Sequence, residues 1–167
     1  MILTVDTAAL TFAADGVTTR CAIGRHGATP AADKREGDGR TPAGRFALRS
    51  ALLRPDRVAR PETALPWRWL DPADGWSDDP ADPAYNTLVR HPRALSAEHL
   101  WRDDGLYDII VTLGHNDAPP VPGMGSAIFL HCASPDFRPT DGCVAIAREA
   151  LEALLPHLST ADWIAIT

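Results

Sequence analysis

The sequence has no excess of basic residues, and this absence narrows the functions open to the chain. Its 16 lysines and arginines stand against 22 aspartates and glutamates, which gives a formal net charge of −6 at pH 7. A general nucleic-acid surface needs Lys and Arg concentrated on one face. We therefore expect no nucleic acid among the partners of this protein.

Cysteines and long apolar runs are also scarce. An odd count of three cysteines (Cys21, Cys132 and Cys143) does not form a disulfide framework. No apolar run approaches the roughly 18 residues that a membrane helix needs. The opening M-I-L-T-V-D has neither the basic nor the apolar region of a signal peptide. Taken alone, these features predict a soluble, cytoplasmic chain without a membrane segment.

The chain does contain the pattern of one β-rich domain spanning residues 1–167. Its 167 residues, 45% of them apolar, suffice for a single core. Short stretches rich in β-branched and apolar residues predict strands at residues 2–5, 10–13, 17–23, 46–53, 107–113, 127–130, 144–147 and 163–166. We expect a mainly β fold with few short helices.

Two helices and three loops complete this prediction. Residues 148–158 place four leucines on one helical face, and residues 96–101 form a shorter candidate with Ser96 as N-cap. Gly, Pro and charged residues predict loops at 24–46, 71–83 and 114–125. The acidic loop at 71–83 lacks the alternating ligands of a calcium site, so we expect a solvated surface there.

The stretch P-T-D-G-C-V-A-I, residues 139–146, contains the best candidate for chemistry. Thr140 and Asp141 form a polar approach, Gly142 permits a tight turn, and Cys143 stands at its apex. The thiolate is the reactive form of cysteine, and its pKa falls where amides or a cation face it. This frame predicts an activated nucleophile, with the Gly142 and Cys143 amides facing an oxyanion. A buried structural cysteine is the alternative.

His131 is the natural partner of Cys143. It ends the apolar run A-I-F-L-H, and the 12 residues to Cys143 are enough for the chain to fold back. A Cys–His pair is the minimum for an activated thiolate. Strand neighbours face opposite sides, so we expect Cys132 to face the core, as should Cys21. The same alternation disfavours a zinc site built from His115, His131, Cys132 and Cys143.

Three stretches, in this order, resemble the L,D-transpeptidase catalytic-domain family, known as the YkuD domain. They are K-R-E-G-D-G-R-T-P-A-G-R-F (34–46), G-S-A-I-F-L-H (125–131) and T-D-G-C-V-A-I (140–146). The stretch Y-D-I-I-V-T-L-G-H-N is similar to one branch of the family. The resemblance spans roughly residues 15–167.

This resemblance implies a β-sandwich-like catalytic domain that transfers acyl groups between peptidoglycan stem peptides. By position, Cys143 is the nucleophile that forms a thioester, His131 the base, and Gly142 a shaper of the oxyanion hole. An amine acceptor gives a transpeptidase and water gives an L,D-carboxypeptidase. The reaction needs no metal or cofactor. Cell-wall biogenesis and cell shape would be the cellular context, so the chemistry implies the cell envelope or periplasm.

The sequence departs from the family signature at two positions. Asp141 stands where the family has His, and Ala145 stands where it has an Arg that helps to orient the donor. We expect Asp141 to point away from the thiol or to hold another group, because a carboxylate disfavours a thiolate. Arg138, Arg148 and Arg90 are candidates to replace the Arg. The short Cys–His spacing also predicts a trimmed loop over the site.

Further residues are expected near the site from their place in the sequence. Asn116 is a candidate donor to a substrate carbonyl, with a loop-stabilising turn as the alternative. Tyr107, Thr140, Asp141 and Arg138 complete the candidate substrate-binding set, and His115 is a weaker candidate for a second base.

Two other functions remain open from the sequence. One is a degenerate, non-catalytic domain that binds wall peptides or a protein partner, which Asp141 and Ala145 favour. The other is a cysteine peptidase or amidase that uses the same Cys–His pair on another substrate. Reactivity of the Cys143 thiol would separate an enzyme from a binding domain, whereas the oligomeric state stays open.

Overall fold

The computed structural model describes residues 1–167, and strands make up most of its regular structure. The strands are β1 (Ile2–Asp6), β2 (Thr11–Ala14), β3 (Val17–Ala22), β4 (Ala28–Pro30), β5 (Thr41–Leu53), β6 (Trp67–Trp69), β7 (Asp74–Ser77), β8 (Leu88–Arg90), β9 (Ala97–His99), β10 (Ile109–Leu113), β11 (Phe129–Cys132), β12 (Val144–Ile146) and β13 (Trp163–Ile166). The helices are the α-helix α1 (Arg148–Leu154) and the 3₁₀ turns η1 (Ala31–Asp33) and η2 (Leu155–His157). The fold is therefore mainly β, as predicted.

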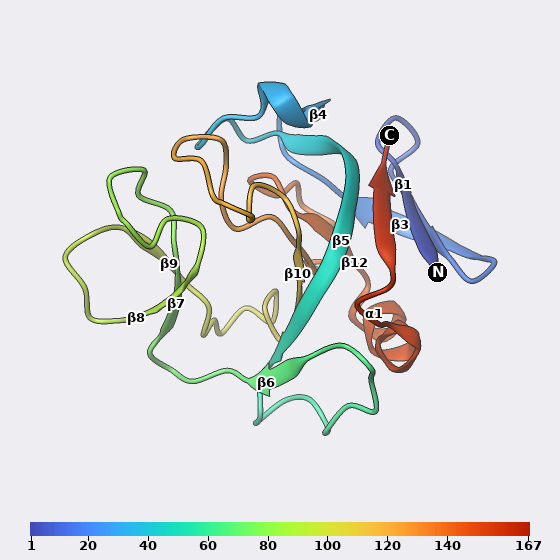
Figure 1. The fold of residues 1–167 in the computed structure, drawn as a ribbon. Helices are drawn as coiled ribbons and strands as arrows, with labels where there is room; N and C mark the ends of the chain where they lie inside the picture. Colours follow the sequence, from blue (N-terminus) through green and yellow to red (C-terminus); the bar gives the residue numbers. More distant parts are fainter.

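The long strand β5 closes the main sheet around the core. Its first part, Gly44 to Ala47, pairs with β13, and its second part, Leu48 to Leu53, pairs with β10. The remaining order runs β10-β11-β12-β3-β2-β1-β13. Figure 1 shows β5 bending through the middle of the molecule, with β13 and β1 beside it. Because β5 joins both edges, the strands enclose one apolar interior.

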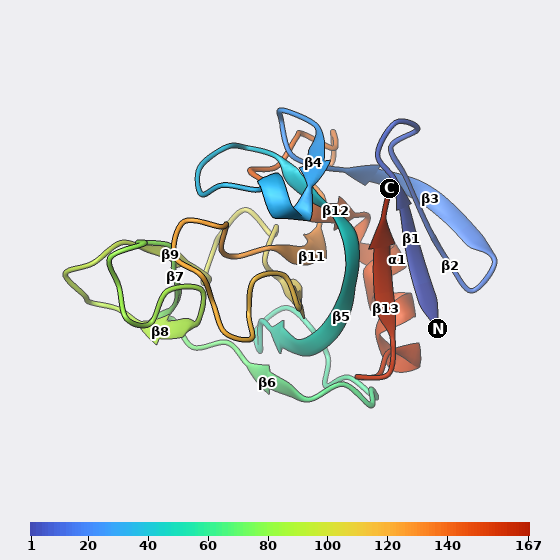
Figure 2. The same cartoon turned by 45° about the horizontal axis from the view of Figure 1, so that its top comes forward.

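The main core lies inside this closed sheet and is capped by α1. It contains 26 buried residues, among them Cys21, Cys132 and Leu151. In β1 the burial alternates, with Leu3 and Val5 inward, as expected for a strand with one face in the core. Helix α1 packs against β11 and β10, and in the view of Figure 2 it lies behind β13. Both expectations for the cysteines, that Cys21 and Cys132 face the core, are confirmed.

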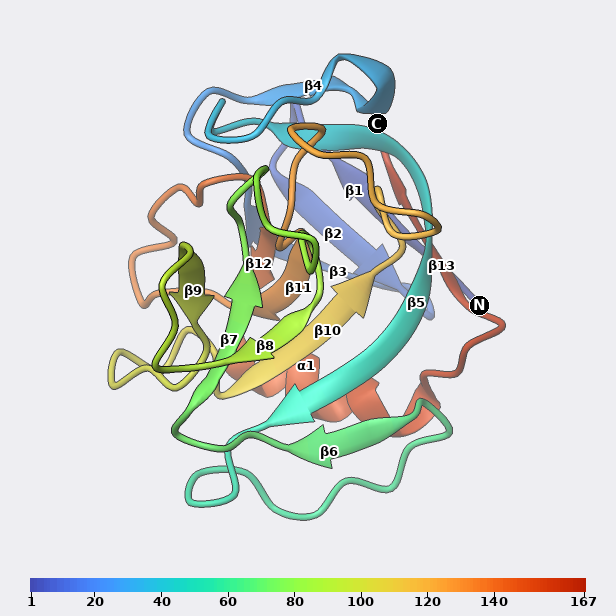
Figure 3. The same cartoon turned by 60° about the vertical axis from the view of Figure 1, so that its left-hand side comes forward.

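A second, smaller sheet packs against the outside of β10 and β11. Its order is β8-β7-β9, and it comes forward in Figure 3. The Trp76 ring meets the Phe129 ring edge-on, with the centroids 5.1 Å apart. A separate cluster of seven buried residues lies at this junction and includes Phe129, Tyr107 and Cys143. The candidate nucleophile therefore lies between the two sheets and not in the main core.

Two predictions for this region are wrong. Residues 96–101 do not form a helix: Ala97–His99 are β9, which pairs with β7 and buries Leu100. A six-residue segment has too little helical stability of its own to compete with a sheet that accepts its backbone hydrogen bonds. The segment 71–83 is also not only a solvated loop, since it contains β7 and the fully buried Asp74, which pairs with Arg68.

The C-terminal helix is confirmed, although its last turn is η2. Leu151 is completely buried in the core, so Leu151→Ala should lower the free energy of unfolding by about 2–5 kcal/mol through lost burial and a cavity. Glu149→Ala, at an exposed position of the same helix, should change it by less than about 0.5 kcal/mol. Urea unfolding measures both, and equal effects would contradict this packing.

None of the helices has the length and apolar character that crossing a bilayer requires.

Candidate active site

The loop before β12 holds Cys143 through a network of threonine hydroxyls. Thr140 Oγ1 donates to the Cys143 carbonyl at 2.7 Å and accepts from the Gly142 amide at 3.1 Å. Thr41 Oγ1 donates to the same carbonyl at 3.4 Å and accepts from the Gly24 amide at 2.8 Å. These bonds tie the loop to β5, so the cysteine is presented from a fixed backbone.

Gly142 is required at its position by space and by backbone conformation. Its φ is +143°, a region that L side chains rarely adopt. A Cβ there would lie 3.0 Å from the Arg40 carbonyl oxygen and 3.2 Å from Ile128 Cδ1. The predicted role of Gly142 in the turn is therefore supported. Its amide, however, is taken by Thr140, whereas the Cys143 amide has no hydrogen-bond partner within the chain.

The sulfur of Cys143 lies against the backbone that leads into β11. Sγ donates to the Ala127 carbonyl at 3.1 Å and accepts from the Phe129 amide at 3.3 Å. The residue is only 7% exposed. These contacts hold the thiol against the backbone of residues 127–129. Its other side faces the cleft described below.

His131 lies on the same face as Cys143, one step along the neighbouring strand. In the parallel pair β11–β12, Leu130 pairs with Val144 and His131 with Ala145. Cys143 and Ala145 share a face because side chains alternate, so His131 and Cys143 are diagonal neighbours. No hydrogen bond joins them: His131 Nδ1 bonds the Cys132 carbonyl at 2.8 Å. Catalytic hydrogen bonds are often absent before substrate binds.

The predicted lowering of the Cys143 pKa is wrong for this state of the protein. Burial raises the pKa of the thiol to about 12, and the negative charge of Glu98 acts in the same direction. Burial also lowers the pKa of His131 to about 4. A neutral thiol beside a neutral imidazole results, because desolvation disfavours both charged forms. The sequence shows the partners but not how deeply they are buried.

Cys143 and His131 both line a cleft of about 640 Å³ between the two sheets. Its wall also contains Tyr107, Thr140, Asp141, Arg138, Ala127 and Ile128. The volume falls within the roughly 300–1,000 Å³ range of typical small-molecule sites. The structure therefore brings together the predicted nucleophile, its predicted base and four of the five predicted substrate-binding residues.

The contacts of Thr140 are described above, and the other three of these four residues also have defined neighbours. Tyr107 is buried, its hydroxyl donates to Glu98 Oε1 at 2.5 Å, and its ring meets the His131 ring edge-on at 5.1 Å. Asp141 is largely exposed and pairs with Arg25, as expected for a carboxylate that holds another group. Arg138 is 69% exposed and pairs with Asp136 at 3.3 Å.

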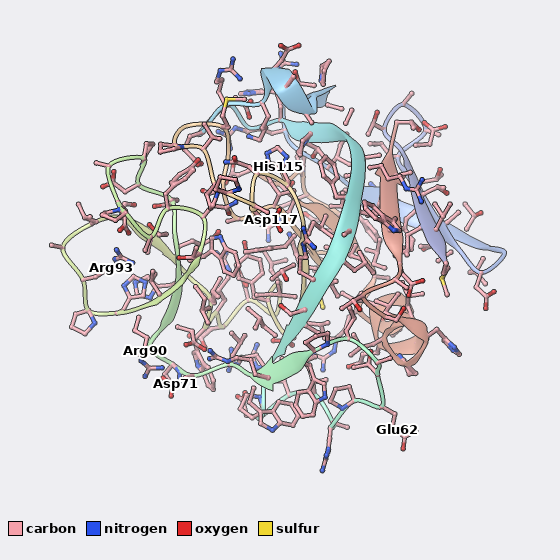
Figure 4. The ribbon with its side chains drawn as sticks, in the orientation of Figure 1. Glu62, Asp71, Arg90, Arg93, His115 and Asp117 are labelled. Carbon is pink, nitrogen blue, oxygen red and sulfur yellow. The ribbon has the colours of Figure 1, made fainter.

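Asn116 is not brought to the cleft. It has a φ of +50°, and its side chain bonds the Val121 backbone and the Gly125 carbonyl. These contacts close its own loop, which is the turn-stabilising alternative. His115 is likewise held in that loop, with Nε2 3.0 Å from the Met124 carbonyl oxygen. Figure 4 shows His115 beside the upper half of β5.

Two of the three arginine candidates also lie elsewhere. Arg90 pairs with Asp71 at 3.0 Å, and Figure 4 shows the two side by side at the edge of the smaller sheet. Arg148 starts α1 and pairs with Asp108 at 2.5 Å. Neither lines the cleft, whereas Arg138 does.

Several residues at the cleft were missed by the sequence analysis. Glu36, Asp78 and Glu98 line it, as do Arg25 and Arg102. Glu98 lies on β9, the segment predicted as a helix, and Asp78 follows β7 in the segment predicted as a loop. No motif marks Asp78 and Glu98, and only the pairing of β7 with β9 reveals their place at the cleft.

Comparison with known proteins identifies a family for this chain. A family model, YkuD: L,D-transpeptidase catalytic domain, matches residues 1–166. No curated protein matches the sequence.

Solved structures similar to this chain include three bacterial proteins. They are Bdellovibrio bacteriovorus Bd1075 (15% identity, TM-score 0.49), Mycobacterium tuberculosis L,D-transpeptidase 1 (13%, 0.45) and an L,D-transpeptidase from Mycobacterium smegmatis (15%, 0.42). The similarity covers 99% of this chain in each case, but only 47%, 60% and 58% of those chains. The chain thus spans about half to three fifths of their length.

Proposed function

Since the chain belongs to the L,D-transpeptidase catalytic-domain family, we propose that it transfers peptidoglycan acyl groups through a thioester on Cys143. The observation that carries this proposal is that Cys143 and His131 line one cleft, with His131 on β11 and Cys143 at the position that directly precedes β12. Nucleophile and base on neighbouring strands are the arrangement that covalent acyl transfer needs.

In the proposed first half-reaction, Cys143 attacks the carbonyl carbon of the bond that holds the terminal D-alanine. The neutral thiol gives its proton to His131 as the new C–S bond forms. The unpartnered Cys143 amide donates to the oxygen that becomes negative. His131 then returns the proton to the D-alanine amine as the C–N bond breaks, which leaves a thioester and free D-alanine.

In the second half-reaction an amine or water attacks the thioester. His131 accepts the proton of the incoming group and returns it to the sulfur, so the thiol is regenerated. An amine from a second peptide gives a cross-link, and water gives carboxypeptidase activity. Arg138 is the only one of the three predicted arginines that lines the cleft, and we assign it to the donor in place of the family Arg.

A wild-type assay tests this proposal with two substrates. The first is a synthetic stem tetrapeptide, from which D-alanine release is measured with and without an added amine acceptor. The second is a carbapenem, which should add one adduct to the intact mass. If folded protein neither releases D-alanine nor forms the carbapenem adduct, acyl transfer is rejected and the non-catalytic binding domain is favoured. Two observations support that alternative: the absence of a Cys143–His131 hydrogen bond and the raised pKa of the Cys143 thiol.

A further inference from the structure

Ala127 has a backbone conformation that alanine rarely adopts, and it lies beside the sulfur of Cys143. Its φ is +52°, in the left-handed region where a Cβ is crowded by the following carbonyl oxygen. Strained residues of this kind cluster at functional sites, where surrounding contacts hold them in place. Ala127 lines the cleft, and its carbonyl accepts from Cys143 Sγ at 3.1 Å. The strain is therefore located at a group that holds the thiol.

The contact that holds Ala127 comes from Asn86, which lies in the turn between β7 and β8 of the smaller sheet. Asn86 is only 6% exposed. Its Oδ1 accepts from the Ala127 amide at 3.1 Å and from Trp76 Nε1 at 2.8 Å. The amide of Ala127 is thus bound by Asn86, while its carbonyl is bound by Cys143.

The side chain of Asn86 uses all of its hydrogen-bonding capacity. In addition to the two contacts of Oδ1, Nδ2 donates to the carbonyls of His115 at 3.2 Å and Asn116 at 2.7 Å. A side-chain amide has two acceptor lone pairs and two N–H donors, so these four contacts fix its orientation. Asn86 is therefore a rigid support for the amide of Ala127.

This support reaches the sulfur at two atoms. Besides its bond to the Ala127 carbonyl, Cys143 Sγ accepts from the Phe129 amide at 3.3 Å. The Phe129 ring is itself held edge-on by the Trp76 ring, with the centroids 5.1 Å apart. The smaller sheet thus holds both ends of the segment 127–129, and both ends of this segment hold Sγ.

We propose that Asn86 is a positioning residue for the nucleophile, because it holds Ala127 in the left-handed conformation that places Cys143 Sγ in the cleft. Asn86 does not line the cleft, so it acts through Ala127 and not on a substrate. The catalytic consequence rests on the proposed function, whereas the placement of the thiol does not. Misplacement of a reacting atom by about 1 Å can cost about a hundredfold in rate.

The first experiment replaces Asn86 with glycine, which tolerates the φ of +57° at this position but removes the side chain. Iodoacetamide alkylation of Cys143 at pH 8 should rise about tenfold, because a less buried thiol ionises more readily. Acylation by a carbapenem should instead fall about tenfold to a hundredfold, because the sulfur is no longer aimed at the carbonyl carbon. Peptide mapping measures alkylation at each cysteine, and intact mass measures acylation.

Two controls separate positioning from a general loss of stability. Alkylation of Cys21 and Cys132 should not change, since both thiols lie in the main core. Thr87→Ala removes a bond within the same turn, from Thr87 Oγ1 to the Ala84 carbonyl at 2.6 Å. This exposed substitution should leave both rates at Cys143 within about twofold of wild type.

A double variant tests whether the effect passes through Ala127. Glycine adopts the left-handed conformation without support, whereas the conformation costs alanine about tenfold in population. Adding Ala127→Gly to Asn86→Gly should therefore recover about tenfold of the lost acylation and lower the alkylation of Cys143 again. A general structural defect would not be repaired by a second glycine, which only adds freedom to the unfolded chain.

Ala127→Val disturbs the same contact from the other side, and it decides the matter if Asn86→Gly does not fold. A β-branched residue is a rare outlier in the left-handed region, so this variant should show the same two opposite changes with Asn86 intact. Unchanged rates at Cys143, a parallel rise at all three cysteines, or a double variant without recovery would each overturn the proposal.

The two reagents keep this proposal apart from the proposed function. Carbapenem acylation requires an acyl-accepting site, whereas iodoacetamide reports only the accessibility and ionisation of the thiol. If the wild-type protein does not react with the carbapenem, acyl transfer fails, and the alkylation rates still decide whether Asn86 places Cys143. If acylation occurs but Asn86→Gly changes neither rate, acyl transfer stands and the role of Asn86 is rejected.

Discussion

Replacing Cys143 with alanine is expected to abolish D-alanine release and the carbapenem adduct while the domain stays folded. We expect a loss of activity of about 10⁴-fold or more, because removing the nucleophile removes the covalent route altogether. The other two thiols cannot substitute for it, since Cys21 and Cys132 are buried in the main core on the other side of the sheet. Intact mass and D-alanine release measure the loss.

The fold should tolerate this substitution. Cys143 belongs to the small cluster of seven residues and not to the main core of 26. Alanine removes one sulfur atom and its two backbone contacts, which we expect to lower the free energy of unfolding by about 1–2 kcal/mol. Circular dichroism and urea unfolding of the variant check that lost activity does not reflect unfolding.

Cys132→Ala is the matched control. It removes a thiol 2% exposed on the adjacent strand, facing away from the cleft. Burial raises the pKa of Cys132 to about 12, so the thiol pKa alone does not distinguish it from Cys143. Only position does. Cys132→Ala should therefore keep the adduct and the turnover, and a persistent adduct in Cys143→Ala would refute the assigned nucleophile.

The sequence predicted most of the strands and identified Cys143 as the candidate nucleophile, because both inferences depend on local patterns. Short stretches of apolar residues mark β1 and β11, and the alternation of side chains along a strand separates His131 from Cys132. Gly142 could be assigned to a tight turn because only glycine adopts that backbone readily. These features are encoded within a few residues, so they do not require knowledge of what lies elsewhere in the chain.

The missed features depend on contacts between distant segments. Glu98 reaches the cleft because β9 pairs with β7, and a short segment with a good N-cap gives no sign of that pairing. Thr41 holds the Cys143 carbonyl across 102 positions of sequence. Asn116 has the amide group that the prediction requires, but this amide hydrogen-bonds within its own loop. Sequence thus identifies chemical groups, whereas pairing decides which of them meet.

Burial is a second property that the sequence did not reveal, and it changes how Cys143 is expected to respond to pH. The rate of alkylation by iodoacetamide at Cys143 should rise about tenfold per unit between pH 6 and pH 9, roughly a thousandfold in all. Its pKa of about 12 keeps the thiolate a small fraction throughout this range, so no plateau is reached. Peptide mapping of the alkylated product gives the rate at this residue.

The alkylation series must stop near pH 9, because burial also raises the pKa of the other cysteine thiols and this affects the stability of the fold. Unfolded cysteines lose their protons near pH 8.5, whereas burial raises the pKa of Cys21 to about 11 and those of Cys132 and Cys143 to about 12. The folded state then binds more protons than the unfolded state, so stability falls as pH rises above about 8.5. Circular dichroism at each pH confirms that alkylation reports the folded protein.

A plateau near neutral pH would instead indicate a preformed thiolate–imidazolium pair and contradict the buried neutral pair. The variant His131→Gln sharpens the distinction. If the pair is neutral before substrate binds, His131 acts only while the donor is attacked. Its loss should then leave alkylation nearly unchanged but lower carbapenem acylation by about 10²–10⁴-fold. Slow reaction with a simple electrophile is therefore compatible with an enzyme, and acylation by a donor is the measurement that separates catalysis from binding.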